Sequence, residues 1–440
     1  MLRGMAGALV TDLYELNMVV SYLKRGMTAP ATFSLFIREL PPGWGFFIAT
    51  GLEACLDHFE HFRFTDADLD FLRETQGYDE ATLDALRDLR FTGDVVAVPE
   101  GRVVYPNEPL LEVTAPLPEA QLVETILLNQ VTYQTAVGSK AARCVLAAPD
   151  KEMVDFALRR VHGGEAGIGV ARATAIAGFE ATSNVEAARL LGLRAAGTMA
   201  HSYIEAFQTE EEAFRAFAED FPEQVVLLVD TYDTIRGVEK AIEVVREMQG
   251  VHLRGIRLDS GDLGALARES RALLDAAGME EVRIFASGGL DERKIADLAD
   301  TPIDAFGVGS RVGVAADSPT LDSVYKLVEY DGRPVAKLSA AKATLPGRKQ
   351  VFRGEEGDVL GLRDEDLPGE PLLVDVVKGG ERVDRGTWRE ARDRCAADLE
   401  ALGKDRRGLD AAPIEIPRSE ALTALDREIR EEIRKREASH

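Results

Sequence analysis

MVDFAL (residues 153–158) is the first of six short apolar runs, and the others are LRAAGT (193–198), VVLLVD (225–230), LRGIRL (253–258), VRIFAS (282–287) and DAFGVG (304–309). Segments of helical periodicity separate them, so strand and helix patterns alternate through residues 155–311. The later runs begin about 20 to 30 residues apart, which fits one strand, one helix and two loops. This pattern predicts a parallel βα barrel. Six strands are too few to close an eightfold barrel, so we expect an incomplete, TIM-like barrel or one that borrows strands.

Polar, cationic or glycine residues follow each predicted strand, in the segments FALRR, GTMAHS, VDTYD, RLDSGD, SGGLD and GVGSR. In parallel barrels, function gathers at these ends, because the loops are free to vary while the strands hold them in place. Together the segments supply cations, carboxylates, one histidine and glycine turns. This combination suits a phosphorylated substrate.

Composition limits the function classes. The 440 residues carry a net charge of −24, and 45% of them are hydrophobic. The length predicts two or three domains with a sizeable core. The negative charge argues against a nucleic-acid partner or an anionic membrane surface, because both need clustered Lys and Arg. No signal peptide is found, and no apolar run reaches the ~18 residues of a membrane span. We therefore expect a soluble, cytoplasmic protein.

The three cysteines, Cys55, Cys144 and Cys395, lie far apart in the sequence. They form no CxxC pair, and no histidine stands at metal-ligand spacing from them. Neither a disulfide framework nor a zinc site is indicated.

Three segments are predicted along the chain. Residues 1–148 form an N-terminal α/β domain with a small β element and a long helix (119–148) that bridges to the barrel. Residues 149–320 form the βα-barrel catalytic domain. Residues 321–440 pack on the N-terminal domain and include a hairpin that turns at Asp331-Gly332.

Glycines follow the last two predicted strands, at Gly288-Gly289 and at Gly309-Ser310. Glycine lets backbone N–H groups approach a phosphate closely, and loops after late barrel strands recur as phosphate sites. Tight turns alone would also explain such glycines. Two of these turns on adjacent late strands favour phosphate binding.

Arg257 and Asp259 lie on the same side of a predicted strand, because side chains alternate with period two. The pair could combine a cation for phosphate or pyrophosphate with a carboxylate for a ribose hydroxyl or Mg²⁺. The alternative, which the sequence favours less, is an ion pair that closes the barrel mouth. Asp230 and Asp233 add carboxylates one strand earlier, and a magnesium-bound polyphosphate would use that much acid.

His201 follows the second predicted strand and is flanked by Thr198 and Ser202. A single histidine is commonly structural, but this context favours catalysis. Phe156 and Arg159 follow the first strand, where an aromatic ring and a guanidinium could hold a flat anionic ring by stacking and bidentate hydrogen bonds. They could also be a core residue and a rim residue.

With these segments in place, the chain resembles nicotinate phosphoribosyltransferase, of the type II phosphoribosyltransferase family. The resemblance covers roughly the first two thirds of the chain. It is carried by nine motifs in a fixed order: TDLYELNM (11–18), FSLFIRELPPGWGFFIATGLE (33–53), DFALRR (155–160), GFEATSNV (178–185), GTMAHSYIEAF (197–207), VDTYDT (229–234), RLDSGDL (257–263), SGGLD (287–291) and GVGSR (307–311).

The resemblance implies a reaction. Nicotinate would condense with 5-phosphoribosyl-1-pyrophosphate to give nicotinate mononucleotide and pyrophosphate, with Mg²⁺ as the cofactor and with coupled ATP hydrolysis. This would be the first step of NAD salvage from nicotinate, performed by an ATP-dependent, ligase-type enzyme. The ATP step of the family phosphorylates a histidine, and His201 is the matching position.

The resemblance also implies roles for matching residues. Tyr14, contributed by a second subunit, and Phe156 would stack on the pyridine ring, so the protein would be a homodimer with shared active sites. His201, Arg257 and Asp259 would be catalytic. The remaining roles are substrate binding by Arg159, Ser183, Thr198, Ser202 and Asp230, phosphate binding by Gly288, Gly289, Gly309 and Ser310, and magnesium binding, through pyrophosphate, by Asp230 and Asp259.

Ser183 bears on substrate choice. Related nicotinamide-using enzymes have an acidic residue at the corresponding place, and an acid accepts an amide N–H but repels a carboxylate. A hydroxyl can donate to a carboxylate, so nicotinate is favoured. Ala157 departs from the family pattern, which commonly has Gly after Phe156, and it would narrow the approach to the ring without changing the reaction.

Two alternatives differ from this interpretation. A sibling enzyme that uses nicotinamide or quinolinate would share the barrel, but should carry an acid at Ser183 or a denser cationic pocket. A non-catalytic NAD-metabolite sensor would share the fold but should have lost the catalytic set. His201, Arg257 and Asp259 are all present, which argues against the sensor.

Overall fold

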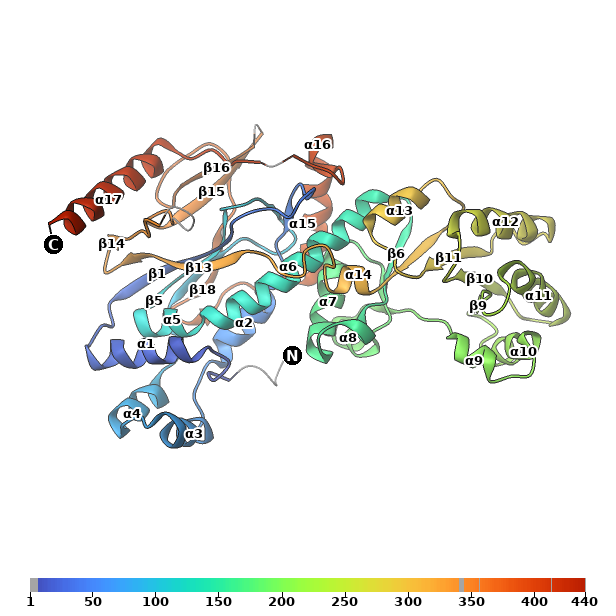
Figure 1. The fold of residues 1–440 in the computed structure, drawn as a ribbon, viewed down its shortest axis with the longest axis horizontal. Coiled ribbons are helices and arrows are strands. Elements are labelled where there is room, and N and C mark those ends of the chain that lie inside the picture. Colours follow the sequence, from blue (N-terminus) through green and yellow to red (C-terminus); the bar gives the residue numbers. More distant parts are fainter. Residues whose placement is uncertain (1–6, 340–343, 356, 413, 440) are drawn as a thin grey trace. The chain divides into compact units, whose positions relative to one another are not determined.

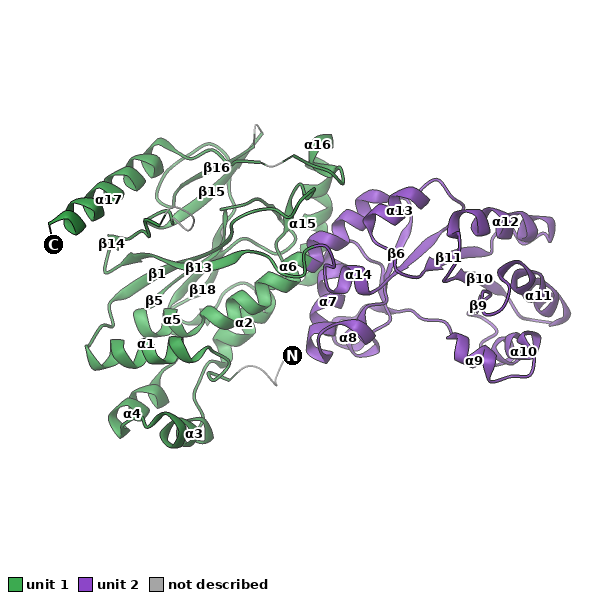
Figure 2. Ribbon diagram, viewed as in Figure 1, with its two compact units in different colours: residues 1–136, 318–440 green, residues 137–317 purple. Residues whose placement is uncertain are grey.

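The structure is a computed structural model that describes residues 7–339, 344–355, 357–412 and 414–439. The chain forms two compact units, coloured separately in Figure 2. The first unit combines residues 1–136 with residues 318–440, and the second comprises residues 137–317. The first unit is therefore discontinuous in sequence, and the second is inserted into it as one continuous segment.

A seven-stranded sheet of order β8-β7-β6-β12-β11-β10-β9 forms the framework of the second unit. Every neighbouring pair of strands is parallel. With β8 and β9 at its two edges, the sheet is an open half-barrel, which confirms the predicted incomplete parallel βα barrel. Its strands are β6 (Glu152–Asp155), β7 (Ala181–Thr182), β8 (Arg194–Ala195), β9 (Val225–Leu228), β10 (Leu253–Leu258), β11 (Arg283–Ser287) and β12 (Ala305–Val308).

The strand count differs from the six that the sequence predicted. The additional strand is β7, whose two residues are too few to show any alternation of apolar and polar side chains. Strand β8 keeps only two residues of the run 193–198. The rest of that run leaves the sheet as a loop that leads to His201.

Helices alternate with these strands, as the sequence predicted. Helices α10, α11 and α12 pack on strands β9, β10 and β11. Thr209 and Glu212 form a capping box at the start of α10. The helical segments are η1 (Leu158–Arg160), α7 (Gly164–Ile176), α8 (Val185–Leu191), α9 (His201–Glu205), α10 (Glu210–Asp220), α11 (Thr234–Glu247), α12 (Leu263–Ala276), α13 (Glu292–Leu298) and α14 (Ser310–Gly313).

Strand β10 shows how the sheet separates the core from the inner face of the half-barrel. Ile256 and Leu258 are fully buried, and helices α11 and α12 pack on this strand. Arg257 lies between them in sequence and therefore points to the opposite face. The inner face thus receives the polar side chains that the strand ends carry.

The first unit is built on a second seven-stranded sheet, of order β14-β13-β1-β5-β3-β18-β19. Its three middle strands are N-terminal, and C-terminal strands form both flanks (Figure 1). This arrangement confirms that C-terminal segments complete the N-terminal α/β domain. The strands are β1 (Pro30–Ile37), β3 (Asp94–Ala97), β5 (Pro109–Pro116), β13 (Ser323–Tyr330), β14 (Arg333–Pro334), β18 (Val374–Lys378) and β19 (Glu381–Arg382).

One pair of the flanking strands was predicted from the sequence. Strands β13 and β14 form the predicted hairpin, with φ of 51° at Asp331 and 70° at Gly332. Strand β1 pairs antiparallel with β13, and β3 pairs antiparallel with β18. Phe33 and Tyr325 stack across the first of these pairs, with 4.7 Å between the ring centroids.

The remaining elements of the first unit surround this sheet. The long helix predicted at 119–148 is two helices that break at Val123, and the second, α6, runs through the boundary between the units. The elements are α1 (Leu13–Lys24), β2 (Phe47–Ile48), α2 (Leu52–His61), α3 (Asp66–Gln76), α4 (Glu80–Asp88), β4 (Val103–Val104), α5 (Leu117–Leu122), α6 (Glu124–Ala147), β15 (Lys349–Gly354), β16 (Gly357–Leu362), β17 (Glu370–Pro371), α15 (Trp388–Ala401), α16 (Lys404–Arg407) and α17 (Glu420–Ala438).

Two features predicted from composition can be compared with the fold. Cys55, Cys144 and Cys395 are buried and form no disulfide. Within the described part of the chain, no helix combines the length and the apolar character that crossing a membrane requires.

Candidate active site

Arg257 is the centre of a polar cluster at the strand ends of the second unit. Its Nε donates to Ser287 Oγ (2.9 Å), and its Nη1 donates to Thr198 Oγ1 (3.2 Å) and to the Met199 carbonyl oxygen (3.3 Å). Its Nη2 lies 2.8 Å from Asp259 Oδ1. The guanidinium thus ties together the residues that follow β8, the end of β10 and the end of β11.

Asp259 contacts this guanidinium, and Asp230, at the end of the neighbouring strand, contacts the segment that carries Asp259. Asp230 Oδ2 accepts the backbone N–H of Asp259 (3.0 Å) and the hydroxyl of Ser260 (2.7 Å). Asp230 Oδ1 is buried and has no hydrogen-bond partner among the described residues. The Ser287 hydroxyl donates to Asp259. Asp259 Oδ1 accepts both of its hydrogen bonds, so among the described residues each carboxylate has one oxygen without a partner that could take a cation or a substrate hydroxyl.

The charge state of Asp259 follows from its neighbours. Burial opposes its ionisation, but hydrogen bonds from Ser287 and Arg257, together with the charges of Arg257 and His201, hold the pKa of Asp259 below its usual value. Asp259 is therefore ionised at neutral pH.

His201 is the first residue of α9 and is partly buried. Its Nδ1 lies 3.2 Å from Thr231 Oγ1, and Thr231 directly follows Asp230 in sequence. The other ring nitrogen makes no hydrogen bond to any described residue. The imidazole is thus held at one nitrogen, and the second nitrogen is without a partner in the described part of the chain.

Phe156 lies directly after β6, against strand β12. Its backbone N–H donates to the Val308 carbonyl (2.8 Å), and a Cβ at Gly307 would collide with its ring. The Arg257 guanidinium carbon lies 5.5 Å from the ring centroid. A Cβ at Gly309 would lie 3.1 Å from the Phe156 carbonyl oxygen. Glycines on β12 and just after it therefore make the room that Phe156 occupies.

Ser183 lies directly after β7 and is partly exposed. Its backbone N–H donates to the Asp155 carbonyl (2.8 Å), which places it beside the loop that carries Phe156. The residues predicted to contact the pyridine ring thus follow two adjacent strands, β6 and β7.

Gly288 and Gly289 have positive φ values, of 100° and 63°, and both are exposed. A Cβ at Gly288 would collide with the Asp259 carbonyl oxygen, so only glycine fits there. Lys294 Nζ donates to the Gly289 carbonyl (3.0 Å). The glycine turn is therefore in direct contact with the loop that carries Asp259.

Several predicted residues are not joined to this cluster. Arg159, in η1, and Ser202, in α9, are exposed, and their side chains make no hydrogen bond or ion pair with the residues that the structure describes. Ser310 is the first residue of α14 and is partly exposed.

Tyr14 belongs to the first unit, on α1, and half of its surface is exposed. Burial of the rest, the charges of Glu124 and Glu15, and hydrogen bonds to these two carboxyl groups raise the pKa of Tyr14. Its hydroxyl is therefore protonated and held between two acids, while the ring is accessible.

Comparison with known proteins extends over both units. Residues 9–132 match the family model of the nicotinate phosphoribosyltransferase N-terminal domain, and residues 137–322 match that of the quinolinate phosphoribosyl transferase C-terminal domain. A nicotinate phosphoribosyltransferase of Mycobacterium tuberculosis is 48% identical over 419 residues, which cover 93% of this chain and 90% of the relative. The chain belongs to the nicotinate phosphoribosyltransferase family.

A nicotinate phosphoribosyltransferase of Bacillus subtilis is 42% identical, over 83% of this chain and 78% of the relative. One of Homo sapiens is 34% identical, over 84% of this chain and 83% of the relative. The crystal structure of human nicotinic acid phosphoribosyltransferase matches with a TM-score of 0.85 and 30% identity over 95% of this chain and 99% of that one. The crystal structure of nicotinate-nucleotide pyrophosphorylase from Pyrococcus furiosus matches with a TM-score of 0.75 and 27% identity. This match covers 90% of the present chain and 95% of that one. The likeness to the nicotinate phosphoribosyltransferase family therefore includes the C-terminal third, for which the sequence motifs gave no match.

Sequence reasoning gave no individual role to three residues that the family fold brings into this site. Ser287 joins Arg257 to Asp259, and Thr231 holds the ring of His201. Asp155 contacts the loops after β6 and β7. Each is adjacent in sequence to a predicted site residue at a strand end, and that position is the signal that could have identified them.

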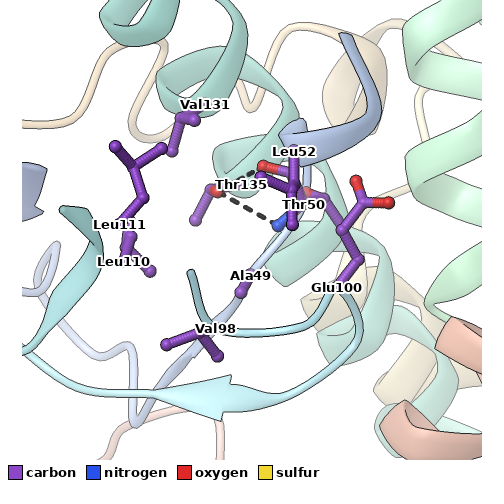
Figure 3. Close-up of a pocket in the computed structure, with 9 residues that line it drawn as sticks. All are labelled: Ala49, Thr50, Leu52, Val98, Glu100, Leu110, Leu111, Val131 and Thr135. Carbon is purple, nitrogen blue, oxygen red and sulfur yellow. Dashed lines mark hydrogen bonds between the residues drawn. The ribbon is translucent and has the colours of Figure 1, made fainter. Parts of the chain in front are cut away.

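A small cavity lies elsewhere, within the first unit (Figure 3). Its polar side chains are Thr50, Thr135 and Glu100, and Thr135 Oγ1 lies 3.1 Å from the Thr50 carbonyl oxygen. The remaining walls are Ala49, Leu52, Val98, Leu110, Leu111 and Val131. Its volume of about 10 Å³ holds at most about one water molecule. The cavity is too small for a substrate, so we place the site at the strand ends.

Proposed function

We propose that this chain is a nicotinate phosphoribosyltransferase. The nitrogen of nicotinate forms a bond to C1 of 5-phosphoribosyl-1-pyrophosphate. The bond from C1 to the pyrophosphate oxygen breaks, and pyrophosphate leaves with the electron pair. The observation that carries the proposal is the contact set of Arg257, Asp259 and Asp230 at the half-barrel strand ends, in a chain of this family.

The charges of this cluster support such a reaction. Breaking the bond builds positive charge on the sugar and negative charge on the leaving group, and fixed groups of opposite charge lower the barrier. Asp259 and Asp230 supply the negative groups, and Arg257 supplies a fixed cation. Phe156 would hold the pyridine ring by stacking, in line with C1.

Mg²⁺ is the proposed cofactor, and it would supply charge neutralisation to the pyrophosphate when bound. No group of three or more His, Cys, Asp and Glu side chains in the described residues is arranged to hold a metal ion unaided. Mg²⁺ that arrives with phosphates needs only one or two carboxylates. The unpartnered oxygen of Asp230 and the ionised Asp259 fit that requirement.

ATP is the proposed co-substrate, and His201 the residue that accepts its phosphoryl group. The ring nitrogen that Thr231 does not hold is the candidate acceptor, because none of the residues that the structure describes occupies it. With this coupling, the protein would be a ligase-type enzyme that salvages nicotinate for NAD synthesis in the cytoplasm.

A homodimer with shared sites is the proposed assembly. Leu13 and Tyr14, at the start of α1, are 47% and 50% exposed, which is high for large apolar side chains and suits a surface that another subunit covers. Sedimentation of the active protein checks this proposal. A fully active monomer would contradict it.

Quinolinate is a second candidate substrate, because residues 137–322 match the quinolinate phosphoribosyl transferase C-terminal domain. Quinolinate carries two carboxylates and would need a denser cationic pocket than Arg257 and Arg159 provide. Nicotinate is therefore the first choice.

Release of pyrophosphate tests the proposal. Purified protein receives 5-phosphoribosyl-1-pyrophosphate, Mg²⁺ and ATP, with nicotinate, nicotinamide or quinolinate in turn. We expect release with nicotinate only. Release with quinolinate or nicotinamide instead would replace the proposed substrate, and release with none would support the sensor.

His201→Ala tests the role of the histidine in the same assay. We expect the variant to lose the acceleration by ATP. The matched control is His252→Ala, because His252 is exposed and precedes the opposite end of strand β10. Equal ATP dependence in both variants would remove His201 from the ATP step.

A further inference from the structure

Asp155 is a buried carboxylate between two loops of the site. It is the last residue of β6 and is 1% exposed. Its Oδ1 accepts the backbone N–H of Ala157 (2.8 Å), and its Oδ2 accepts the hydroxyl of Thr182 (2.7 Å). One side chain therefore fixes the backbone immediately after Phe156 and the residue immediately before Ser183.

Thr182 extends this connection along the second loop. Its hydroxyl oxygen accepts the backbone N–H of Asn184 (3.0 Å). The Asn184 side chain in turn accepts the N–H of Ala187 and caps helix α8 (3.1 Å). The hydrogen-bonded chain that starts at Asp155 thus spans both sides of Ser183 and reaches the start of α8.

Burial differs between the connecting residues and the residues that they flank. Asp155, Ala157, Thr182 and Asn184 are all buried. Phe156 and Ser183 are partly exposed, so a ligand at the strand ends can reach them. The buried network therefore holds two accessible side chains that follow adjacent strands.

A purely structural role accounts less well for a carboxylate here. No ion pair of Asp155 is found among the described residues, and burial raises the pKa of its carboxyl group above its usual value. A buried charge without a cation opposes folding. The two hydrogen bonds that Asp155 accepts, one from each loop, offset this unfavourable burial.

We propose that Asp155 is a positioning residue that sets the distance between Phe156 and Ser183, and so determines the affinity for the pyridine substrate. The inference rests on the proposed function. It adds a residue that determines substrate affinity without touching the substrate. It also predicts that binding of the pyridine depends on residues other than the phosphate-binding cluster around Arg257.

Four variants test this inference in steady-state kinetics with both substrates varied. Asp155→Ala removes both connections, and Thr182→Val removes only the one to the Ser183 loop. Thr182→Ser keeps that hydroxyl and is the matched control. In Asp155→Asn, the side-chain oxygen still accepts the N–H of Ala157. The amide nitrogen faces Thr182, so the side chain donates to the Thr182 hydroxyl instead of accepting from it.

We expect the KM for nicotinate to rise at least about tenfold in Asp155→Ala, the effect of one lost hydrogen bond to a charged group. A smaller rise is expected in Thr182→Val, partial rescue in Asp155→Asn, and no change in Thr182→Ser. The KM for 5-phosphoribosyl-1-pyrophosphate should stay the same in every folded variant. Thermal unfolding of each variant shows which ones are folded, and Thr182→Val carries the test where Asp155→Ala does not fold.

An equal rise of both KM values, or no change of either one in folded Asp155→Ala and Thr182→Val, would overturn the inference. A wild-type protein without nicotinate-dependent activity would instead overturn the proposed function, so the two failures are distinguishable.

Discussion

Arg257 makes its contacts through three different nitrogens, and only a planar guanidinium can direct donors to that many acceptors. Lysine would keep the charge but could not reach Ser287, Thr198 and Asp259 together. We expect Arg257→Lys to lower kcat/KM by roughly 100-fold or more, the effect of losing a fixed electrostatic contact. Steady-state kinetics measure this loss.

The matched control for this prediction is Arg254→Lys, on the same strand. Arg254 is exposed and donates to the Glu223 carbonyl, away from the strand-end cluster. Its variant should keep wild-type kinetics. Comparable losses in the two variants would mean that Arg257 acts through the stability of β10.

Ser183 bears on substrate preference. An aspartate there would face the carboxylate of nicotinate, and two like charges about 4 Å apart repel by roughly 1 to 4 kcal/mol, depending on the local dielectric. We therefore expect Ser183→Asp to weaken nicotinate binding by roughly 5- to 1000-fold and to improve the ratio of nicotinamide to nicotinate turnover. Ser183→Ala, which removes the hydroxyl but adds no charge, should give a smaller loss and no gain in preference for nicotinamide.

Glu108, in the first unit, gives a pH dependence of stability. Burial and then the charge of Asp358 raise the pKa of Glu108 well above its usual value. Glu108 Oε1 is buried and has no hydrogen-bond partner among the described residues, and the cation of Arg353 pairs with Asp358 (2.6 Å). The protonated form of Glu108 is therefore favoured in the folded protein.

The sign of the effect follows from the raised pKa. The contribution of Glu108 to folding is fully present below its unfolded pKa of about 4.3 and is lost as pH rises through the folded pKa. Glu108→Gln mimics the protonated form, so it should be more stable than wild type at pH 9 and similar at pH 5. Urea unfolding at both pH values measures this, with exposed Glu74→Gln as the control. If the free energies of unfolding of wild type and Glu108→Gln differed by the same amount at pH 5 and pH 9, Glu108 would not be the protonated group.

Two residues separate helix α13 from the Gly288-Gly289 turn, and a buried ion pair holds the first turn of the helix. Glu292 is 1% exposed and lies 2.8 Å from Lys140 Nζ and 3.2 Å from Arg143 Nε, both on α6. Truncating Glu292 leaves two buried cations without this partner. We expect Glu292→Ala to reduce the free energy of unfolding by about 3–5 kcal/mol.

Urea unfolding checks this prediction. Asp297→Ala is the matched control, because Asp297 is exposed on the same helix and should change the stability by no more than about 0.5 kcal/mol. A Glu292→Ala variant as stable as this control would show that water replaces the missing carboxylate.

Local sequence patterns were sufficient for most of the elements. The turn of the β13–β14 hairpin needs only neighbouring residues, and it was predicted. Strand β7 was missed because two residues contain no period. The break at Val123 was missed because the helical spacing of apolar residues continues across it.

The contacts within the site could not be predicted in the same way. Arg257 and Thr198 are 59 positions apart, and Asp259 and Ser287 are 28 apart. Such partners depend on the order and register of the strands, which a single sequence does not specify. The sequence therefore predicted which residues gather at the strand ends, while their pairing and the role of Asp155 required the fold.

For the whole molecule, the discontinuity of the first unit predicts unequal effects of truncation. Deleting residues 318–440 removes β13 and β18 and leaves β1 and β3 as edge strands, each paired only with β5. Exposed apolar edges promote aggregation. We expect the truncated chain to be poorly soluble, and hydrogen exchange to show lost protection in β1 and β3 but retained protection in β10 and β11. Protected β1 amides in a soluble truncated chain would contradict this expectation.

The sheet of the first unit has a consequence for biosynthesis. Its middle strands leave the ribosome first, but their partners on both sides leave last, after the whole of the inserted unit. At roughly 5–20 residues per second, the nascent middle strands wait for their neighbours for tens of seconds. The inserted unit can fold during this interval, and the waiting strands are where a cellular chaperone would be needed.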